Sequence, residues 1–161
     1  MTTTGDSATL GDRPVAQQSV QLVACLRRVL PDLLAAEPVS LAYLYGSAAA
    51  GRTTPFSDVD VGLITQGDLE PRELLRMILR LGMALTDACG VSNPDVRILN
   101  GAPLVLRGRV VCEGVLLYAR DDRERVEFET DTRLRYFDFL PIHQMNRDAF
   151  LAAVRERGLY G

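Results

Sequence analysis

The chain has 161 residues, of which 47% are hydrophobic and 24% charged, and its formal net charge is −3. This length indicates one globular domain, and the negative charge argues against the strongly basic footprint of a nucleic-acid-binding protein. All 18 basic residues are arginines, which excludes lysine chemistry such as a Schiff base or the lysine of a P-loop.

The first segment indicates a disordered N-terminal tail and neither a signal peptide nor a membrane helix. Residues 1–13 are rich in Thr, Gly, Asp and Ser and predict a disordered tail, which leaves residues 14–161 as a single domain. The start lacks the pattern of a signal peptide, and no apolar run reaches the ~18 residues of a membrane helix, so we expect a cytoplasmic location. From Pro14, apolar residues repeat with helical spacing as far as Leu34, and we expect Pro31 to kink or restart this helix.

The central stretch is the most informative part of the sequence. Residues 41–45 are apolar and predict a buried strand, which stops at Gly46 and Ser47 in a turn suited to phosphate. Asp58 and Asp60 then alternate with valines, so the two carboxylates are expected on one face of the next strand. Because two carboxylates on one face repel each other, a hard divalent cation such as Mg2+ is the natural occupant.

Two polar residues between the turn and the acids have two interpretations each. Arg52 is near the turn in sequence and either braces a phosphate or is an ordinary surface arginine. Ser57 directly precedes Asp58 and is either a turn-forming residue or a phosphate contact.

A third acid follows one helix later. Pro71 opens an amphipathic helix that is expected to end near Gly90. In the next strand, expected at residues 95–99, Asp95 and Arg97 share one face. Three acids at the ends of core strands are costly unless they bind something, which makes Asp95 a third candidate metal ligand.

The last third predicts a short helix at residues 103–109, a strand at residues 110–118 and a helical region at residues 123–157 that Pro141 divides. This order of elements predicts a mixed β-sheet flanked by helices, in one α/β (α+β) domain. Cys25, Cys89 and Cys112 are widely spaced in apolar surroundings, and we expect them to be reduced core thiols.

The spacing from Gly46 to Asp60 resembles the signature of the nucleotidyltransferase superfamily that includes DNA polymerase β. Residues 94–103 resemble the third-acid strand of its minimal members, and residues 113–129 are similar to the MntA group, the antitoxin partners of HepT toxins. The resemblance implies a polymerase β-like nucleotidyltransferase fold. It also implies Asp58, Asp60 and Asp95 as catalytic metal ligands for two Mg2+ ions.

The resemblance further implies ATP as the substrate, with its terminal phosphates held at Gly46 and Ser47. Members that modify DNA or drugs carry further domains, for which 161 residues leave no room, so the acceptor is expected to be held by its own protein. In the MntA group the implied acceptor is a tyrosine hydroxyl of HepT, a ribonuclease toxin, which is silenced by transfer of AMP.

The leading hypothesis is therefore a protein adenylyltransferase antitoxin, with a HepT-like toxin and a nucleotide as partners and no direct contact with nucleic acid or membrane. One alternative is an antitoxin that acts by binding alone, although the intact acids argue against it. Another is a small-molecule nucleotidyltransferase, acting on an aminoglycoside-like alcohol, that forms its acceptor pocket as a homo-oligomer.

Overall fold

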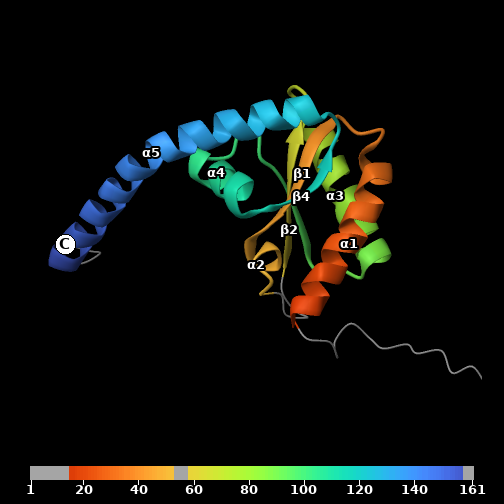
Figure 1. The fold of residues 1–161 in the computed structure, drawn as a ribbon, viewed down its shortest axis with the longest axis horizontal. Helices are drawn as coiled ribbons and strands as arrows, with labels where there is room; N and C mark the ends of the chain where they lie inside the picture. The colour runs from red at the N-terminus through yellow and green to blue at the C-terminus, as the bar shows by residue number, and fades with distance from the viewer. Residues whose placement is uncertain (1–14, 53–57, 158–161) are drawn as a thin grey trace, which may run out of the picture.

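A four-stranded β-sheet forms the centre of the structure, with helices on both of its faces (Figure 1). The computed structural model describes residues 15–52 and 58–157, so the tail expected at residues 1–13 and the candidate residue Ser57 lie outside the described residues. The elements are α1 (Val15–Leu34), β1 (Val39–Tyr45), α2 (Gly46–Ala49), β2 (Val59–Thr65), α3 (Pro71–Cys89), β3 (Pro94–Ile98), α4 (Leu104–Glu113), β4 (Val115–Ala119) and α5 (Asp122–Arg157).

The sheet is mixed, as the sequence predicts. Its strand order is β3-β2-β1-β4, in which β1 pairs antiparallel with both β2 and β4. Strand β2 pairs in parallel with β3, and α3 is the crossover that joins them. The expected α/β (α+β) class with a mixed sheet flanked by helices is therefore confirmed.

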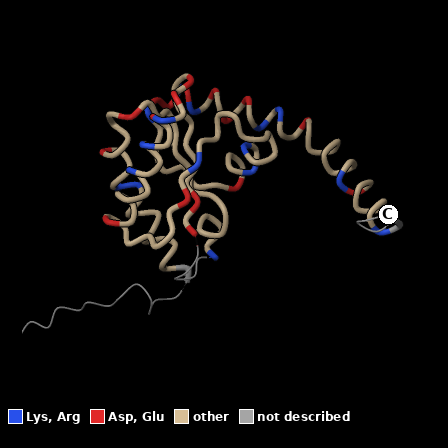
Figure 2. The backbone as a smooth tube through the Cα atoms, turned by 180° about the vertical axis from the view of Figure 1, so that it is seen from behind, with Lys and Arg blue, Asp and Glu red and all other residues tan. Residues whose placement is uncertain are grey.

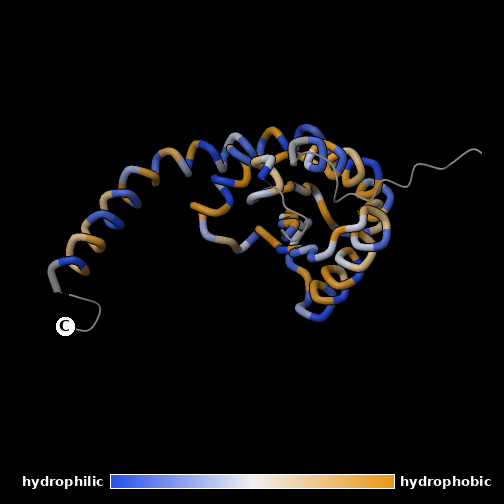
Figure 3. The backbone as a smooth tube through the Cα atoms, turned by 90° about the horizontal axis from the view of Figure 1, so that it is seen from below, coloured by the Kyte–Doolittle hydropathy of each residue, from blue (hydrophilic) through white to orange (hydrophobic). Residues whose placement is uncertain are grey.

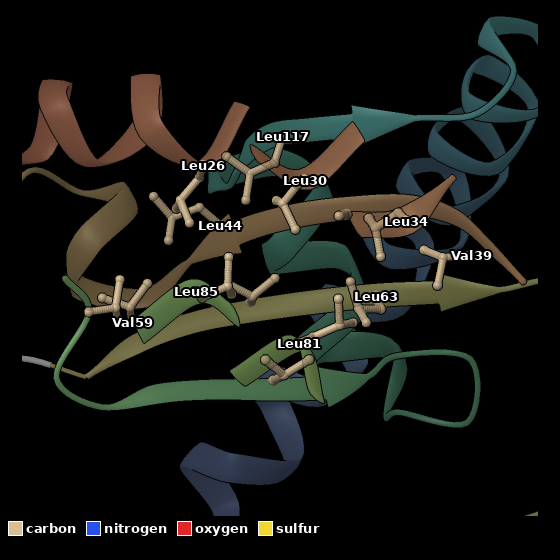
Figure 4. Close-up of a cluster of buried hydrophobic side chains, with 14 of the residues drawn as sticks. Leu26, Leu30, Leu34, Val39, Leu44, Val59, Leu63, Leu81, Leu85 and Leu117 are labelled. Atoms are coloured by element: carbon tan, nitrogen blue, oxygen red, sulfur yellow. The ribbon is translucent and has the colours of Figure 1, made fainter. Parts of the chain in front are cut away.

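Helices α1 and α3 cover one face of the sheet and form the larger apolar core (Figure 4). The buried leucines of this core come from both helices and from the two central strands: Leu26, Leu30 and Leu34 of α1, Leu44 of β1, Leu63 of β2, and Leu81 and Leu85 of α3. Since successive strand residues alternate between faces, the side chains next to these leucines in β1 and β2 point to the opposite face.

On that opposite face, α4 and α5 enclose a second, smaller apolar cluster. Leu41 and Tyr43 of β1 pack there with Ile64 of β2 and Val110 of α4. Leu99, directly after β3, completes the cluster. Asp60 belongs to the same face. It precedes Gly62 and Ile64 of β2 by two and four residues, and these two residues face the smaller cluster.

Helix α3 has the bounds that the sequence indicates. Pro71 occupies its first turn, and Gly90 ends it with a left-handed φ of 65°. Gly90 also donates its backbone N–H to the carbonyl oxygen of Thr86. The crossover between the two parallel strands is thus fixed by a proline at one end and a glycine at the other.

A restart of the first helix at Pro31 and a division of the last helix at Pro141 are both contradicted by the structure. Helix α1 continues through Pro31 to Leu34 without a restart, and α5 is one helix of 36 residues with Pro141 inside it. Pro141 removes one intrahelical hydrogen bond, that to the carbonyl group of Phe137. Both Phe137 and Pro141 are exposed, so solvent can satisfy that carbonyl, and the outer part of α5 bends rather than breaks (Figure 1).

The strand expected at residues 110–118 is also wrong in its first half. Helix α4 runs on to Glu113, and only residues 115–119 form a strand. The aliphatic residues Val110 and Val111 are buried on α4, so packing overrides their preference for strands. Gly114 separates the two elements because a Cβ there would lie 2.4 Å from the carbonyl oxygen of Val110.

Helix α5 has two parts with different surroundings. Its first part packs on α4, where the ring of Tyr136 lies against Gly108, and it carries ion pairs such as that of Arg123 with Glu127. Basic and acidic residues alternate along this helix (Figure 2). From residue 137 to residue 155 no side chain is buried, and this outer part projects away from the sheet (Figure 3). Its exposed large apolar residues are Phe137, Phe139, Ile142, Met145, Phe150 and Leu151.

The expectation of three reduced core thiols is wrong. Cys25 of α1 and Cys89 of α3 form a disulfide, and Cys112 is a free, exposed cysteine on α4. The two bonded cysteines are 64 residues apart in sequence, but α1 packs beside α3 and brings their Cα atoms to 5.8 Å. Among the described helices, none combines the length and apolar character that a membrane crossing needs.

Candidate active site

The site begins where β1 passes into α2. Gly46, the first residue of α2, has a left-handed φ of 70°, which only glycine adopts without strain. A Cβ atom at this position would lie 2.4 Å from Oδ2 of Asp60. Glycine is therefore required at position 46 for two reasons: the turn needs a positive φ, and the Asp60 carboxylate occupies the space of a Cβ atom. Ser47 follows it and is half-buried.

The sheet register brings two of the predicted acids side by side. Asp60 in β2 is the Cα partner of Tyr45 in β1 and of Asp95 in β3. Asp58 is exposed and directly precedes β2, two residues from Asp60. The period-two alternation that predicts a common face for these acids thus places all three at the same end of the sheet, next to the Gly46 turn.

The acids influence one another electrostatically. Partial burial raises the pKa of the Asp60 carboxyl, and the nearby Asp95 and Asp58 raise it further, while Arg97 opposes them. Carboxylates that raise the pKa of Asp60 in this way are close enough to repel it. Such a group favours an added positive charge.

Arg97 supplies part of that charge and was not predicted as a site residue. Its guanidinium donates hydrogen bonds to Oδ2 of Asp95 from Nε, at 2.8 Å, and from Nη2. This contact raises the pKa of Arg97. The sequence did place Arg97 on the face of Asp95, and that same-face position, two residues from a candidate ligand, was the available signal.

Tyr45 completes this corner of the sheet. Its hydroxyl is buried and has no hydrogen-bond partner among the described residues. Burial raises the pKa of Tyr45, Arg97 lowers it, and the charges of Asp60 and Asp95 raise it. The orphaned hydroxyl shows that this corner offers a hydrogen-bonding group that the rest of the described chain does not use.

Beside the acids, α2 and α4 enclose a pocket of about 350 Å3. Gly46, Ser47 and Arg52 all line it, so the structure brings these three predicted residues together. The opposite wall comes from α4, through Leu106, Arg109, Val110 and Glu113. The sequence does not predict this wall, because it indicates a strand for Val110 and Glu113 and so divides the four residues between two elements. The acids lie next to the pocket through Gly46 and Tyr45, which line it, rather than inside it.

The chemistry of the acids fits a divalent cation. Three carboxylates from two adjacent strands offer only oxygen donors, which suits Mg2+. Within residues 15–52 and 58–157, no three acidic, histidine or cysteine side chains are already grouped closely enough to hold a metal ion. Asp95 is engaged by Arg97, so coordination by all three acids requires Asp95 to exchange Arg97 for the cation. The assignment of Asp58, Asp60 and Asp95 as metal ligands stays a prediction.

The structure places a glycine–serine turn beside acids on adjacent strands of a mixed sheet, which agrees with the nucleotidyltransferase signature that the sequence resembles. The sequence matches the family model described as Polymerase beta, Nucleotidyltransferase, over residues 30–123. Because this match covers more than half of the chain, the protein belongs to the polymerase β nucleotidyltransferase family. A comparison with curated proteins finds no match.

Solved structures of toxin–antitoxin complexes contain similar chains. One, described as a toxin–antitoxin with AMP-PNP, is 24% identical with a TM-score of 0.63, over 78% of this chain and 98% of that chain. A mutant MntA–HepT complex gives 25% identity and a TM-score of 0.60, over 76% of this chain and 94% of that chain.

A third similar chain comes from a complex described as tri-AMPylated Shewanella oneidensis HEPN toxin with MNT antitoxin. It is 22% identical with a TM-score of 0.58, over 80% of this chain and 98% of that chain. The match to this protein thus covers nearly the full length of each of these three chains.

Proposed function

We propose that this nucleotidyltransferase is an antitoxin that transfers AMP from ATP, with Mg2+, to a tyrosine hydroxyl of a HepT-type toxin. One observation carries the proposal. Asp60 and Asp95 are register partners beside the Gly46 turn, in a chain that spans 94% of an MntA–HepT complex chain at 25% identity. A protein that kept only the binding role of an antitoxin would have no need for this arrangement.

The residues divide the work by position. Gly46, Ser47 and Arg52 line the pocket and hold the phosphates, since a guanidinium and a hydroxyl are good partners for phosphate oxygens. Asp58, Asp60 and Asp95 would hold Mg2+, which would neutralise charge on the triphosphate and polarise the phosphorus that is attacked. A bound cation would relieve the repulsion of Asp60 by Asp95 and Asp58.

The transfer is a displacement at phosphorus. The tyrosine oxygen of the toxin forms a bond to the α-phosphorus, the bond from that phosphorus to the bridging oxygen breaks, and pyrophosphate leaves. The proton of the tyrosine hydroxyl passes to the carboxylate of Asp95, which is held at the end of β3. Held phosphates and a positioned acceptor account for most of the rate that such a site provides.

The contents of the complexes with similar chains support a protein acceptor. One of these complexes is described as tri-AMPylated HEPN toxin with MNT antitoxin, and the match covers 98% of the similar chain in it. The pocket has room for one small molecule, which the nucleotide takes. In this proposal a partner protein brings the acceptor hydroxyl to the nucleotide.

The test combines this protein with a HepT-type toxin, Mg2+ and ATP labelled on the α-phosphate. We expect label on the toxin, located to tyrosine by mass spectrometry, and little label with Asp60→Asn. The matched control is Asp68→Asn, which removes an exposed acid after β2 and should leave labelling unchanged. Chelation of Mg2+ should stop labelling and leave the complex of the two proteins intact.

Three outcomes would count against the proposal. Toxin inactivation by the unmodified protein without label transfer would favour an antitoxin that acts by binding. Label on an aminoglycoside-like alcohol in the absence of any toxin would favour a small-molecule enzyme. Equal labelling by Asp60→Asn and Asp68→Asn would show that the acids of β2 do not serve the transfer.

A further inference from the structure

The wall of the pocket formed by α4 has no role in the function proposed above. Leu106, Arg109, Val110 and Glu113 line the pocket and follow the spacing i, i+3, i+4, i+7, so one complete face of α4 is turned toward Gly46 and Ser47. A helix face that combines two apolar and two charged residues over a cavity is suited to an amphipathic ligand.

The charges of this pocket favour an anion. Arg52, after α2, and Arg109, on α4, both line it, and Glu113 is its one acid among the described lining residues. Nη2 of Arg109 lies 3.5 Å from Oε2 of Glu113, and both side chains are more than 60% exposed. Such an exposed pair is held weakly, so the guanidinium of Arg109 can exchange Glu113 for a stronger anion at little cost.

The other arginine of α4 does not share this freedom. Arg107 donates from Nη1 to the carbonyl oxygen of Asn100 at 3.4 Å, its Nε is buried, and it is absent from the pocket lining. Arg109 is therefore the basic group of α4 that is placed and free to meet a ligand beside Ser47.

We propose that Arg109 binds the terminal phosphates of the nucleoside triphosphate and leaves Glu113 as it does so, with Leu106 and Val110 forming the apolar side of the substrate site. This inference rests on the proposed function, because the ligand is the nucleotide of that reaction. A guanidinium forms shorter and stronger paired hydrogen bonds with a phosphate than it does in a solvated pair with a carboxylate. The 350 Å3 of the pocket are in the range of small-molecule sites, about 300–1,000 Å3.

The competing interpretation is that Arg109 and Glu113 form an ordinary surface pair that supports α4. The two interpretations differ in the sign of one effect. If the pair is structural, Glu113→Gln and Arg109→Gln should act alike on nucleotide binding. If Arg109 is a phosphate ligand restrained by Glu113, removal of Glu113 frees it and tightens binding, whereas removal of Arg109 weakens binding.

The experiment measures the dissociation constants of AMP-PNP and AMP, each with Mg2+, by calorimetry on the full chain. We expect Arg109→Gln to weaken AMP-PNP binding about tenfold or more and Glu113→Gln to tighten it up to severalfold. AMP, which lacks the terminal phosphates, should be unaffected by Arg109→Gln. The matched control is Arg123→Gln, which breaks the equivalent i,i+4 pair with Glu127 on α5 and should change neither constant.

The results separate the two proposals. If the unmodified protein does not bind AMP-PNP, the proposed function fails and this inference fails with it. If the unmodified protein binds AMP-PNP and Arg109→Gln binds it as Arg123→Gln does, the inference about Arg109 is overturned and the proposed function stands. Equal weakening of AMP and AMP-PNP by Arg109→Gln would overturn the assignment to the terminal phosphates.

Discussion

The close approach of Gly46 to Asp60 allows a sharp test with Gly46→Ala. The added methyl group would lie 2.4 Å from Oδ2 of Asp60, about 1 Å closer than the 3.4 Å at which ordinary van der Waals contacts begin. Because the backbone of β2 is held in the sheet between β1 and β3, the side chain of Asp60 has to move by about that distance. A displacement of 1 Å at a reacting centre costs on the order of a hundredfold in rate, which is the loss we expect in AMP transfer.

The same substitution has a backbone cost that must be separated from this effect. At a φ of 70°, alanine is strained by about 1–2 kcal/mol relative to glycine. Gly67→Ala provides the matched control, since Gly67 has a φ of 69° and its Cβ would meet nothing within 4 Å. Urea denaturation should show similar losses of stability for both variants, and the transfer assay a loss only for Gly46→Ala. Transfer by Gly46→Ala within threefold of Gly67→Ala would refute the reasoning.

Three further substitutions or treatments test the packing that supports the site. Gly108→Ala would place a Cβ 2.2 Å from the ring of Tyr136, and overpacking between α4 and α5 should lower the free energy of unfolding in urea by about 1–3 kcal/mol. Arg120→Ala removes hydrogen bonds from one guanidinium to four backbone carbonyl groups around the α1–β1 connection and should lower stability by about 2 kcal/mol, seen as a lower Tm. Reduction of the Cys25–Cys89 disulfide, which closes a loop of 64 residues, should cost about 4 kcal/mol in the same urea assay.

Each of these has its own control. Gly101→Ala adds a methyl group in open space and should cost much less than Gly108→Ala. Arg123→Ala removes an exposed arginine from α5 and should change Tm little, unlike Arg120→Ala. Cys112→Ser removes the free thiol and should leave the effect of reduction unchanged. If reductant does not change the free energy of unfolding of the unmodified protein, the stabilising role of the disulfide is contradicted.

The positions of the acids in the sheet could be predicted, because they depend on local patterns in the sequence. Alternation in a strand assigns Asp58 and Asp60 to one face, and the same rule assigns Asp95 to a face of its own strand. Pro71 and Gly90 fix the ends of α3 through their backbone preferences, which also need no knowledge of the rest of the fold.

What could not be predicted depends on contacts between distant segments. Val110 favours a strand by its branched side chain, yet it lies on α4 because that helix buries it against β1 and β2. The pairing of Arg97 with Asp95 and the bond between Cys25 and Cys89 depend on how side chains meet after folding. The α4 wall of the pocket was missed for the same reason, since it exists only once residues 104–113 are helical.

The outer part of α5 has a consequence for how this protein can change over time. Every residue assigned to the site lies between residues 45 and 113, while the outer part begins at residue 137, beyond the last buried side chain, Tyr136. At 1.5 Å per residue, residues 137–155 form a rod of about 30 Å in which no side chain is buried. Substitutions along that rod can alter what the molecule touches without altering its chemistry. Contact and catalysis are thus free to evolve separately in a single short chain.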